Sequence, residues 1–128
     1  MGATRDIALN ELPMRGISVN PIAASGGVAA ITIVPSDSGI VFANKYVTGA
    51  VTYTLPAVGL GAGKMFWFIS AQGTVAENIA ATTACIMGID GTTGTTLTND
   101  SDEGACMCIF GDGTNWYAIP IGATWTVA

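Results

Sequence analysis

The sequence predicts an all-β fold: a β-sandwich or jelly-roll-like domain with an extended N-terminal arm. Short apolar runs rich in β-branched and aromatic residues are separated by Gly, Pro, Asp and Asn, as in strands joined by tight turns. Beyond residue 27, no segment shows the spacing of apolar residues that an amphipathic helix needs. A chain of 128 residues, 50% of them hydrophobic, is long enough to bury a core within one domain.

Residues 1–27 are predicted to form the arm, and residues 28–128 the β-sandwich body. Residues 1–64 contain four cations and three acids, whereas residues 65–128 contain six acids and no cation. A mildly basic segment ahead of an acidic body suggests an arm that docks elsewhere. Ile17, Val19 and Ile22 are too few to form a core, so they need the body, another copy or a partner for burial. The alternative is that this stretch forms the first strand of the same domain.

Four strands are predicted in the first half of the body, at residues 28–34, 40–42, 47–55 and 64–71. Pro35 and Pro56 end the first and third of them, because proline cannot donate a ladder hydrogen bond. In the third strand, Val51, Tyr53 and Leu55 alternate with two threonines, which predicts one buried face. The fourth strand is apolar on both faces, which is typical of a central strand or of a strand at an interface.

Three more strands are predicted at residues 85–89, 105–110 and 116–121, with residues 91–98 as a loop, and residues 125–127 close the chain. Between the second and third of these, Asp112 and Gly113 supply the backbone of a tight hairpin turn. Trp116 then starts a strand, and we expect its indole N–H to meet a carbonyl. Cys106 and Cys108 are two residues apart, so we expect them on one strand face, as free thiols that act as small hydrophobic residues.

The low charge of the chain predicts that it assembles with other proteins. Charged residues make up 10% of the sequence, against about 25% in a typical domain. The exterior must therefore consist largely of Thr, Ser, Asn, Gly and apolar groups, and large apolar patches favour association. We expect an obligate oligomer or a lattice-bound protein. The alternative is a monomer that its net charge of −5 keeps soluble.

Composition also excludes several classes of function. Four Lys and Arg residues cannot form a phosphate-binding stripe, so nucleic acid is not an expected partner. No apolar run approaches the ~20 residues of a membrane span. The absence of His removes most catalytic triads, and three Cys without a C-x-x-C pair form a poor zinc set. The first residues lack the apolar core of a signal peptide, which predicts folding in a reducing cytoplasm.

Two loops match known binding motifs only superficially. Residues 59–64 end in Gly-Lys, but Val58 and Met65 break the phosphate-loop pattern. Residues 99–103 are rich in oxygen atoms but lack the spacing of an EF-hand, so a solvated acidic turn is favoured over a Ca²⁺ site. The other acids lie in turn-like contexts and indicate no catalytic pair. We therefore predict no enzyme activity, no metal and no cofactor.

The second half of the chain contains four short motifs in a fixed order. They are Tyr53-Thr-Leu-Pro56, Gly63-Lys-Met-Phe-Trp-Phe68, Gly111-Asp-Gly-Thr-Asn-Trp-Tyr117 and Gly122-Ala-Thr-Trp125. This succession resembles small virion proteins of tailed bacteriophages: capsid decoration (cement) proteins and head- or tail-fibre modules. The resemblance covers about residues 50–126. It implies an all-β subunit, a homo-trimer on the capsid exterior, bound to the major capsid protein, folded in the cytoplasm of the host bacterium and without catalytic residues.

The predicted function is therefore a non-enzymatic virion protein that decorates and stabilises the capsid. The candidate docking residues are two arginines, which suit interface ion pairs, and three apolar anchors: Arg5, Leu9, Leu12, Arg15 and Ile17. The alternative is a fibre or lectin-like module that recognises host-surface glycans through its loops. For that role the candidate residues are Asp100, Asp102 and Asn115.

Overall fold

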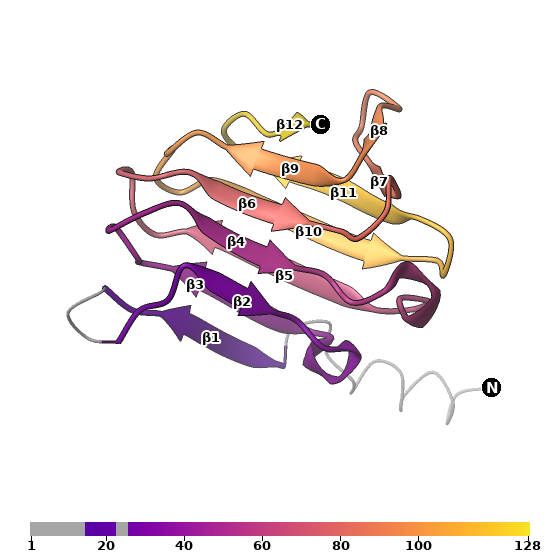
Figure 1. Cartoon of the computed structure of the whole chain (residues 1–128), viewed down its shortest axis with the longest axis horizontal. Coiled ribbons are helices and arrows are strands. Elements are labelled where there is room, and N and C mark those ends of the chain that lie inside the picture. The colour runs from indigo at the N-terminus through magenta and orange to yellow at the C-terminus, as the bar shows by residue number, and fades with distance from the viewer. Residues whose placement is uncertain (1–14, 23–25) are drawn as a thin grey trace, which may run out of the picture.

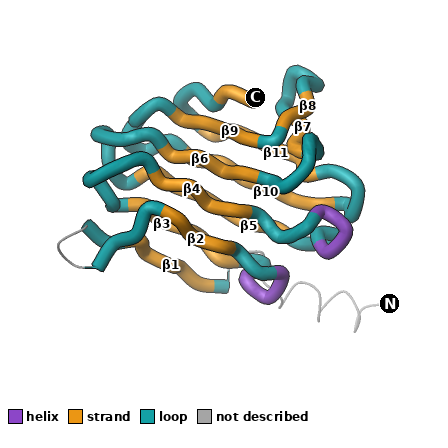
Figure 2. Tube along the Cα trace, in the orientation of Figure 1, coloured by secondary structure: helices purple, strands orange, loops and turns teal. Residues whose placement is uncertain are grey.

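The computed structural model describes residues 15–22 and 26–128, and within them the fold is all-β, with two facing sheets (Figure 1). Sheet A has seven strands in the spatial order β1 (Gly16–Asn20), β3 (Ile40–Asn44), β5 (Met65–Ser70), β10 (Cys106–Gly111), β11 (Trp116–Ile121), β7 (Ile86–Met87) and β8 (Thr93–Gly94). Sheet B has five, in the order β12 (Thr126–Val127), β9 (Thr96–Asn99), β6 (Glu77–Ala80), β4 (Val51–Thr54) and β2 (Ala30–Thr32). Two 3₁₀ turns, η2 (Pro35–Asp37) and η3 (Val58–Leu60), lie at the same end of the molecule (Figure 2).

From β1 to β6 the chain alternates between the two sheets and winds through three successive coils. Neighbouring strands in these coils are parallel: Ile17 on the first coil lies opposite Val41 on the second, and Val41 lies opposite Trp67 on the third. Sheet B repeats the pattern with β2, β4 and β6. This is the winding of a short β-solenoid, so the predicted jelly-roll arrangement is wrong. Turn residues indicate where a strand ends but not whether the next strand joins the same sheet or the opposite one.

The later strands close the molecule mainly with antiparallel pairs, and the predicted hairpin is among them. Strands β10 and β11 pair in the register that places Gly111 opposite Trp116. The Asp112 carboxylate accepts the backbone N–H groups of Thr114 and Asn115, each at 2.7 Å, and Gly113 has a φ of 91°. The Asp-Gly hairpin is therefore confirmed, with a glycine at the position that requires positive φ.

Two of the sequence-based element assignments are wrong. Residues 91–98 do not form only a loop, because β8 and most of β9 lie there. Strand β6 was not predicted, since its inward-facing residues are Glu77 and Ile79 and the acid interrupts the apolar alternation. Strands β6 and β9 extend sheet B, and β8 extends sheet A.

The second half of the predicted arm lies within the body. Strand β1 pairs with β3 in parallel, and the backbone N–H of Arg15 donates to the Gly39 carbonyl at 2.6 Å. For residues 16–20 the structure therefore shows the alternative interpretation, a strand of the same domain. Arg5, Leu9 and Leu12 lie outside the described residues.

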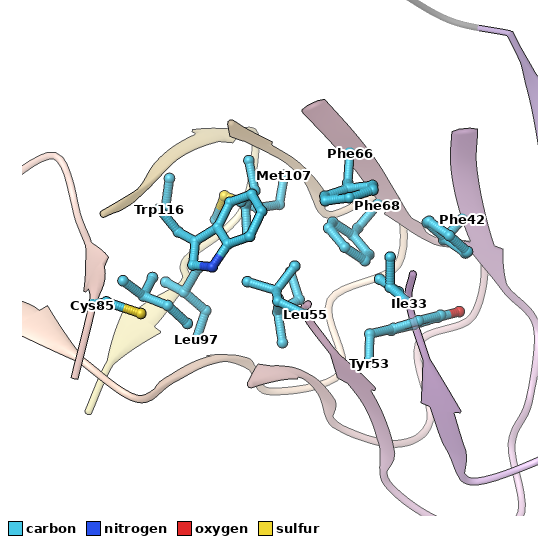
Figure 3. Close-up of a cluster of buried hydrophobic side chains, with 14 of the residues drawn as sticks. Ile33, Phe42, Tyr53, Leu55, Phe66, Phe68, Cys85, Leu97, Met107 and Trp116 are labelled. Carbon is cyan, nitrogen blue, oxygen red and sulfur yellow. The ribbon is translucent and has the colours of Figure 1, made fainter. Parts of the chain in front are cut away.

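The core fills the space between the sheets (Figure 3). Val51, Tyr53 and Leu55 are buried, whereas Thr52 and Thr54 on the same strand are partly exposed, which confirms the predicted faces. Aromatic rings form the centre: Phe42 and Phe68 stack with their centroids 5.5 Å apart, and Tyr53 meets Phe68 edge-on at 5.3 Å. Such pairs add to the stabilisation from buried area.

Trp116 anchors the other part of the core. Its side chain is fully buried beside Phe66, with ring centroids 5.8 Å apart, and Figure 3 shows it next to Met107. The expected hydrogen bond from the indole N–H to a carbonyl is wrong, since the described residues offer that group no partner. The ring packs against backbone instead: a Cβ atom on Gly61 would lie 2.5 Å from the indole ring.

Candidate assembly interface

The outer faces of the two sheets have opposite chemistry. Along each strand, side chains alternate between the core and the exterior, so the outer residues are those between the buried ones. On sheet B the outer residues are mostly threonine and asparagine: Ala30, Thr32, Thr52, Thr54, Asn78, Ala80, Thr96, Thr98 and Thr126. One pair of them is hydrogen-bonded, because the Thr98 hydroxyl donates to the Asn78 side chain at 2.8 Å. This face is polar and suited to water.

The outer face of sheet A is apolar along three rows that cross the strands. The first row is Val19, Ala43, Ile69, Cys106 and Ile121. The second is Ile17, Val41, Trp67, Cys108 and Ile119. The third is Met65, Phe110, Tyr117 and Met87. We call these fourteen residues the apolar face; none is charged, and the tyrosine hydroxyl is the single hydroxyl among them.

Several side chains of the apolar face are open to solvent in the single chain. Ile17 is 65% exposed, Ile121 49%, Val19 45% and Ile119 43%. Between them the small residues Ala43 and Cys108 are covered by their larger neighbours, and Phe110 stacks on Tyr117 at 5.7 Å. The result is a continuous, filled surface rather than scattered apolar side chains. Contiguous apolar patches of this kind mark interaction sites on proteins.

The two cysteines of the apolar face are uncharged. Both lie on the outer side of β10, which confirms that they share a strand face, and both are free thiols. Burial raises the pKa of Cys106, with a further contribution from the Glu77 carboxylate, and burial likewise raises the pKa of Cys108. Protonated thiols act as small hydrophobic groups, so they leave the face without charge at neutral pH.

Of the predicted docking residues, Ile17 lies on the apolar face and Arg15 lies beside it. The Arg15 guanidinium donates to the Ser36 carbonyl at 2.9 Å and is exposed, so it lies over the turn that contains η2. Strand β1 also forms one edge of sheet A, with β3 as its neighbour in that sheet. The structure thus places Ile17, a predicted docking residue, on an edge strand of sheet A and on the apolar face.

The predicted loop residues do not form one site. Asp100 follows β9, and Asn115 precedes β11, at opposite ends of the molecule (Figure 1). Asp102 exchanges hydrogen bonds with Asn99, its N–H donating at 2.9 Å and its carboxylate accepting at 3.1 Å. The Asn115 N–H is bound by Asp112. These polar residues stabilise turns, and within residues 15–22 and 26–128 no group of three His, Cys, Asp or Glu side chains is placed to hold a metal.

A row of buried side-chain amides closes the turns at one end of the sheets. Asn20 binds both backbone groups of Val28, at 2.8 and 2.9 Å, and also donates to the Asn44 side chain at 3.2 Å. One coil later the Asn44 oxygen accepts the N–H of Tyr46 at 3.1 Å, and in the third coil Gln72 accepts two N–H groups. These buried amides form hydrogen bonds with turn backbone groups, in place of the hydrogen bonds to water that burial removes.

Glu77 is a buried carboxylate beside this row, and sequence analysis missed it. Its side chain is 0% exposed, and neither oxygen has a hydrogen-bond partner of good geometry in the described part of the chain. Burial raises its pKa to about 7, although Asn44 and Ser70 lie near enough to offset part of this rise. The signal was present, because Glu77 and Ile79 are two residues apart and must share a strand face.

A hollow of about 460 Å³ opens beside β12. Its lining includes Leu97, Met107, Trp125, Asp90 and Thr92. Asp90 is exposed, and a hydrogen bond from the backbone of Thr92 lowers the pKa of its carboxyl. Among the described residues that line the hollow, Asp90 is the only one with an acidic or basic side chain.

The chain was compared with family models and with curated proteins, and neither comparison finds a match. No helix in the part of the chain that the structure describes is long and apolar enough to cross a membrane. The surfaces described above and the sequence motifs are therefore the features from which a function can be inferred.

Proposed function

We propose that this protein is a non-enzymatic structural component of a bacteriophage virion that binds the outside of the capsid and stabilises it. The observation that supports this role most directly is the apolar face, an uncharged surface across the rows of sheet A that suits a protein partner. The motif Gly111-Asp-Gly-Thr-Asn-Trp-Tyr117 and its companions resemble those of phage virion proteins. Both features belong to an assembly subunit rather than to a catalyst.

Stabilisation of the capsid would follow from binding alone. A protein that binds the assembled shell and not its separate subunits shifts the equilibrium towards the shell, in proportion to occupancy and affinity. In a homo-trimer, three binding segments engage neighbouring sites at high effective concentration, which raises the avidity. The major capsid protein is the proposed partner.

The proposed contact with the capsid uses the N-terminal residues and the edge of β1. Arg5, Leu9 and Leu12 supply charge and apolar anchors, and Arg15 continues the same segment to the start of β1. An edge strand offers unpaired backbone N–H and C=O groups, to which an extended segment of a partner can add. The capsid protein would then bind by both backbone and side chains.

Deletion of residues 1–14 tests this contact without removing β1. We expect the shortened protein to lose binding to shells of the same phage in co-sedimentation, because three of the docking residues are gone. Its thermal unfolding midpoint should stay close to that of the full chain, since Gly16–Asn20 still pairs with β3. Full binding by the shortened protein would contradict the proposed docking segment. A control variant, Lys45→Gln, removes an exposed cation elsewhere and should bind normally.

Glycan recognition is the second candidate, and the hollow beside β12 favours it. A half-buried tryptophan, Trp125, lies there with Asp90, Thr92 and Thr124, and sugars bind between aromatic faces and oxygen atoms. Binding of host-surface polysaccharide in a glycan array, abolished by Trp125→Ala, would support this role. Absence of any glycan signal together with shell binding would exclude it.

A further inference from the structure

We infer that the apolar face is covered by other copies of this chain. The inference rests on the proposed structural role and deepens it, since it names the partner of the same surface. One uncharged surface runs across sheet A from the edge strand β1 to β11, and it includes Ile17 and Val19 on β1, the cysteines of β10, and Ile119 and Ile121 on β11. In water, such a surface favours association with another apolar surface.

The chemistry of the apolar face indicates which kind of surface can cover it. A partner with charged groups at this surface would bury them without counter-charges, which is unfavourable, so the partner surface must also be uncharged and apolar. The outer face of sheet B does not meet this requirement, because threonine and asparagine cover it. The apolar face of another copy does meet it, and identical copies are always present together. Each chain has a net charge of −5. Because the apolar face has no charged residue, contact through it leaves the charged residues of each copy outside the interface.

The size of the face is also suitable. Strands lie about 4.8 Å apart and each residue rises about 3.3 Å, so the three rows across six strands cover roughly 450 Å² of flat surface. Stable interfaces bury about 600–1,000 Å² of accessible surface per partner, and accessible area exceeds flat area on a sheet covered by side chains. The face is therefore of the order that a closed, symmetric oligomer needs. Under the proposed function we expect three copies.

The test compares a lysine placed on each outer face. Ile119→Lys puts a charge on the apolar face, at the β11 end of the second row and at a position already 43% exposed, so the single chain should still fold. We expect light scattering after size exclusion to show the mass of one chain for this variant and a multiple of that mass for the unmodified protein. The dissociation constant of the oligomer should rise by about tenfold or more, because the lysine must lose water in the interface. Thr52→Lys, the matched control on sheet B, should keep the oligomer.

Thiol labelling provides a second measurement on the same samples. Cys106 lies on the apolar face and is partly exposed in the single chain, whereas Cys85 is buried in the core. We expect maleimide to react slowly with Cys106 in the unmodified protein and faster in Ile119→Lys, with Cys85 unreactive in both. An unchanged unfolding midpoint would show that faster labelling does not come from misfolding.

Three results would overturn the inference. In the first, the unmodified protein has the mass of one chain, and Cys106 is labelled faster after residues 1–14 are deleted. That result would show that residues 1–14 cover the apolar face. The second is a single-chain mass with Cys106 protected by added shells alone, which assigns the face to the capsid and leaves the proposed function intact. The third is an oligomer that persists in Ile119→Lys. Conversely, an oligomer that Ile119→Lys dissociates but that binds no shell supports the inference and contradicts the proposed function.

Discussion

Replacing Trp116 with alanine should lower the free energy of unfolding by about 4 kcal/mol, because large aromatic residues cost about 3–5 kcal/mol when they are removed from a core. The side chain is fully buried, contacts Phe66 and packs against the backbone at Gly61 and Gly111. Urea denaturation followed by circular dichroism measures the change. Trp116→Phe should cost much less, since the indole N–H makes no hydrogen bond with the described residues that phenylalanine would lose. A loss below about 1 kcal/mol for Trp116→Ala would contradict the packing described, because that is within the range of surface substitutions and small methyl deletions.

A double-mutant cycle with Gly61 separates this packing from general destabilisation. Gly61 has a φ of −90°, which alanine adopts without strain, but a Cβ atom there would lie 2.5 and 2.6 Å from two atoms of the Trp116 ring. Gly61→Ala should therefore destabilise the unmodified protein by overpacking and be tolerated once Trp116 is alanine. Equal costs of Gly61→Ala in both backgrounds would show that the two residues do not contact each other.

The stability of the protein should fall as pH rises from about 4.5 to about 7, because of Glu77. Its carboxyl has a pKa of about 7 in the fold against 4.5 in the unfolded reference, so between these values the folded chain binds more protons. Stability then decreases with rising pH, and the full difference is roughly 3 kcal/mol, at about 1.36 kcal/mol for each pKa unit. Below about pH 4.5 the Glu77 carboxyl is protonated in both the folded and the unfolded chain, so it causes no loss of stability there. The physical cause is the cost of a buried charge without partners.

Other titrating groups act outside this window. Hydrogen bonds from their own turns lower the pKa of Asp90 and Asp112, both exposed, so these residues affect stability below about pH 4. Tyr53 lies on β4, the strand next to β6, which carries Glu77; burial and that carboxylate raise its pKa, so it acts in alkaline solution. Cys106 is the other group whose pKa responds to Glu77, and its raised pKa places its ionisation above the window.

Glu77→Gln measures the Glu77 contribution directly, since glutamine keeps the shape and removes the charge. We expect the variant to exceed the unmodified protein in stability at about pH 8, by an amount of the order of the pH effect, and to match it near pH 5. Glu103→Gln, at an exposed position with the same change of side chain, should behave like the unmodified protein at both values. If Glu77→Gln keeps the same slope of stability against pH, the buried carboxylate is not its source.

Local chemistry explains which parts of the fold the sequence predicted. Strand β11 has the predicted bounds, because an Asp-Gly turn, two aromatic residues that start the strand and two isoleucines occur together within a short stretch. From apolar residues on both of its faces, β5 was predicted to be either a central strand or a strand at an interface, and it lies inside sheet A between β3 and β10. The parallel coils were not, since Ile17, Val41 and Trp67 lie far apart in the sequence and no local signal marks their pairing. The pairing of one coil with the next depends on how the whole coil is buried, which no short stretch of sequence indicates.

The sequence predicted a surface that binds a partner, but it did not predict where on the fold that surface lies. The low fraction of charged residues indicated that the surface needs a partner, and Ile17 was named among its anchors. The position of the face could not be predicted, because it depends on which strands become neighbours in sheet A. Cys108 and Ile119, for example, meet Trp67 in one row through the register of three strands. The loop residues were predicted as binding groups, whereas Asp102 stabilises its own turn.

Sedimentation equilibrium of the unmodified full-length chain, without shells or other proteins, tests the proposed self-association most directly. Burial of the apolar face between copies predicts a particle whose mass is a multiple of that of one chain at micromolar concentration. The mass should be the same at low and at high salt, since the interface contains no ion pairs for salt to screen. A single species with the mass of one chain across the whole concentration range would contradict burial of the face between copies.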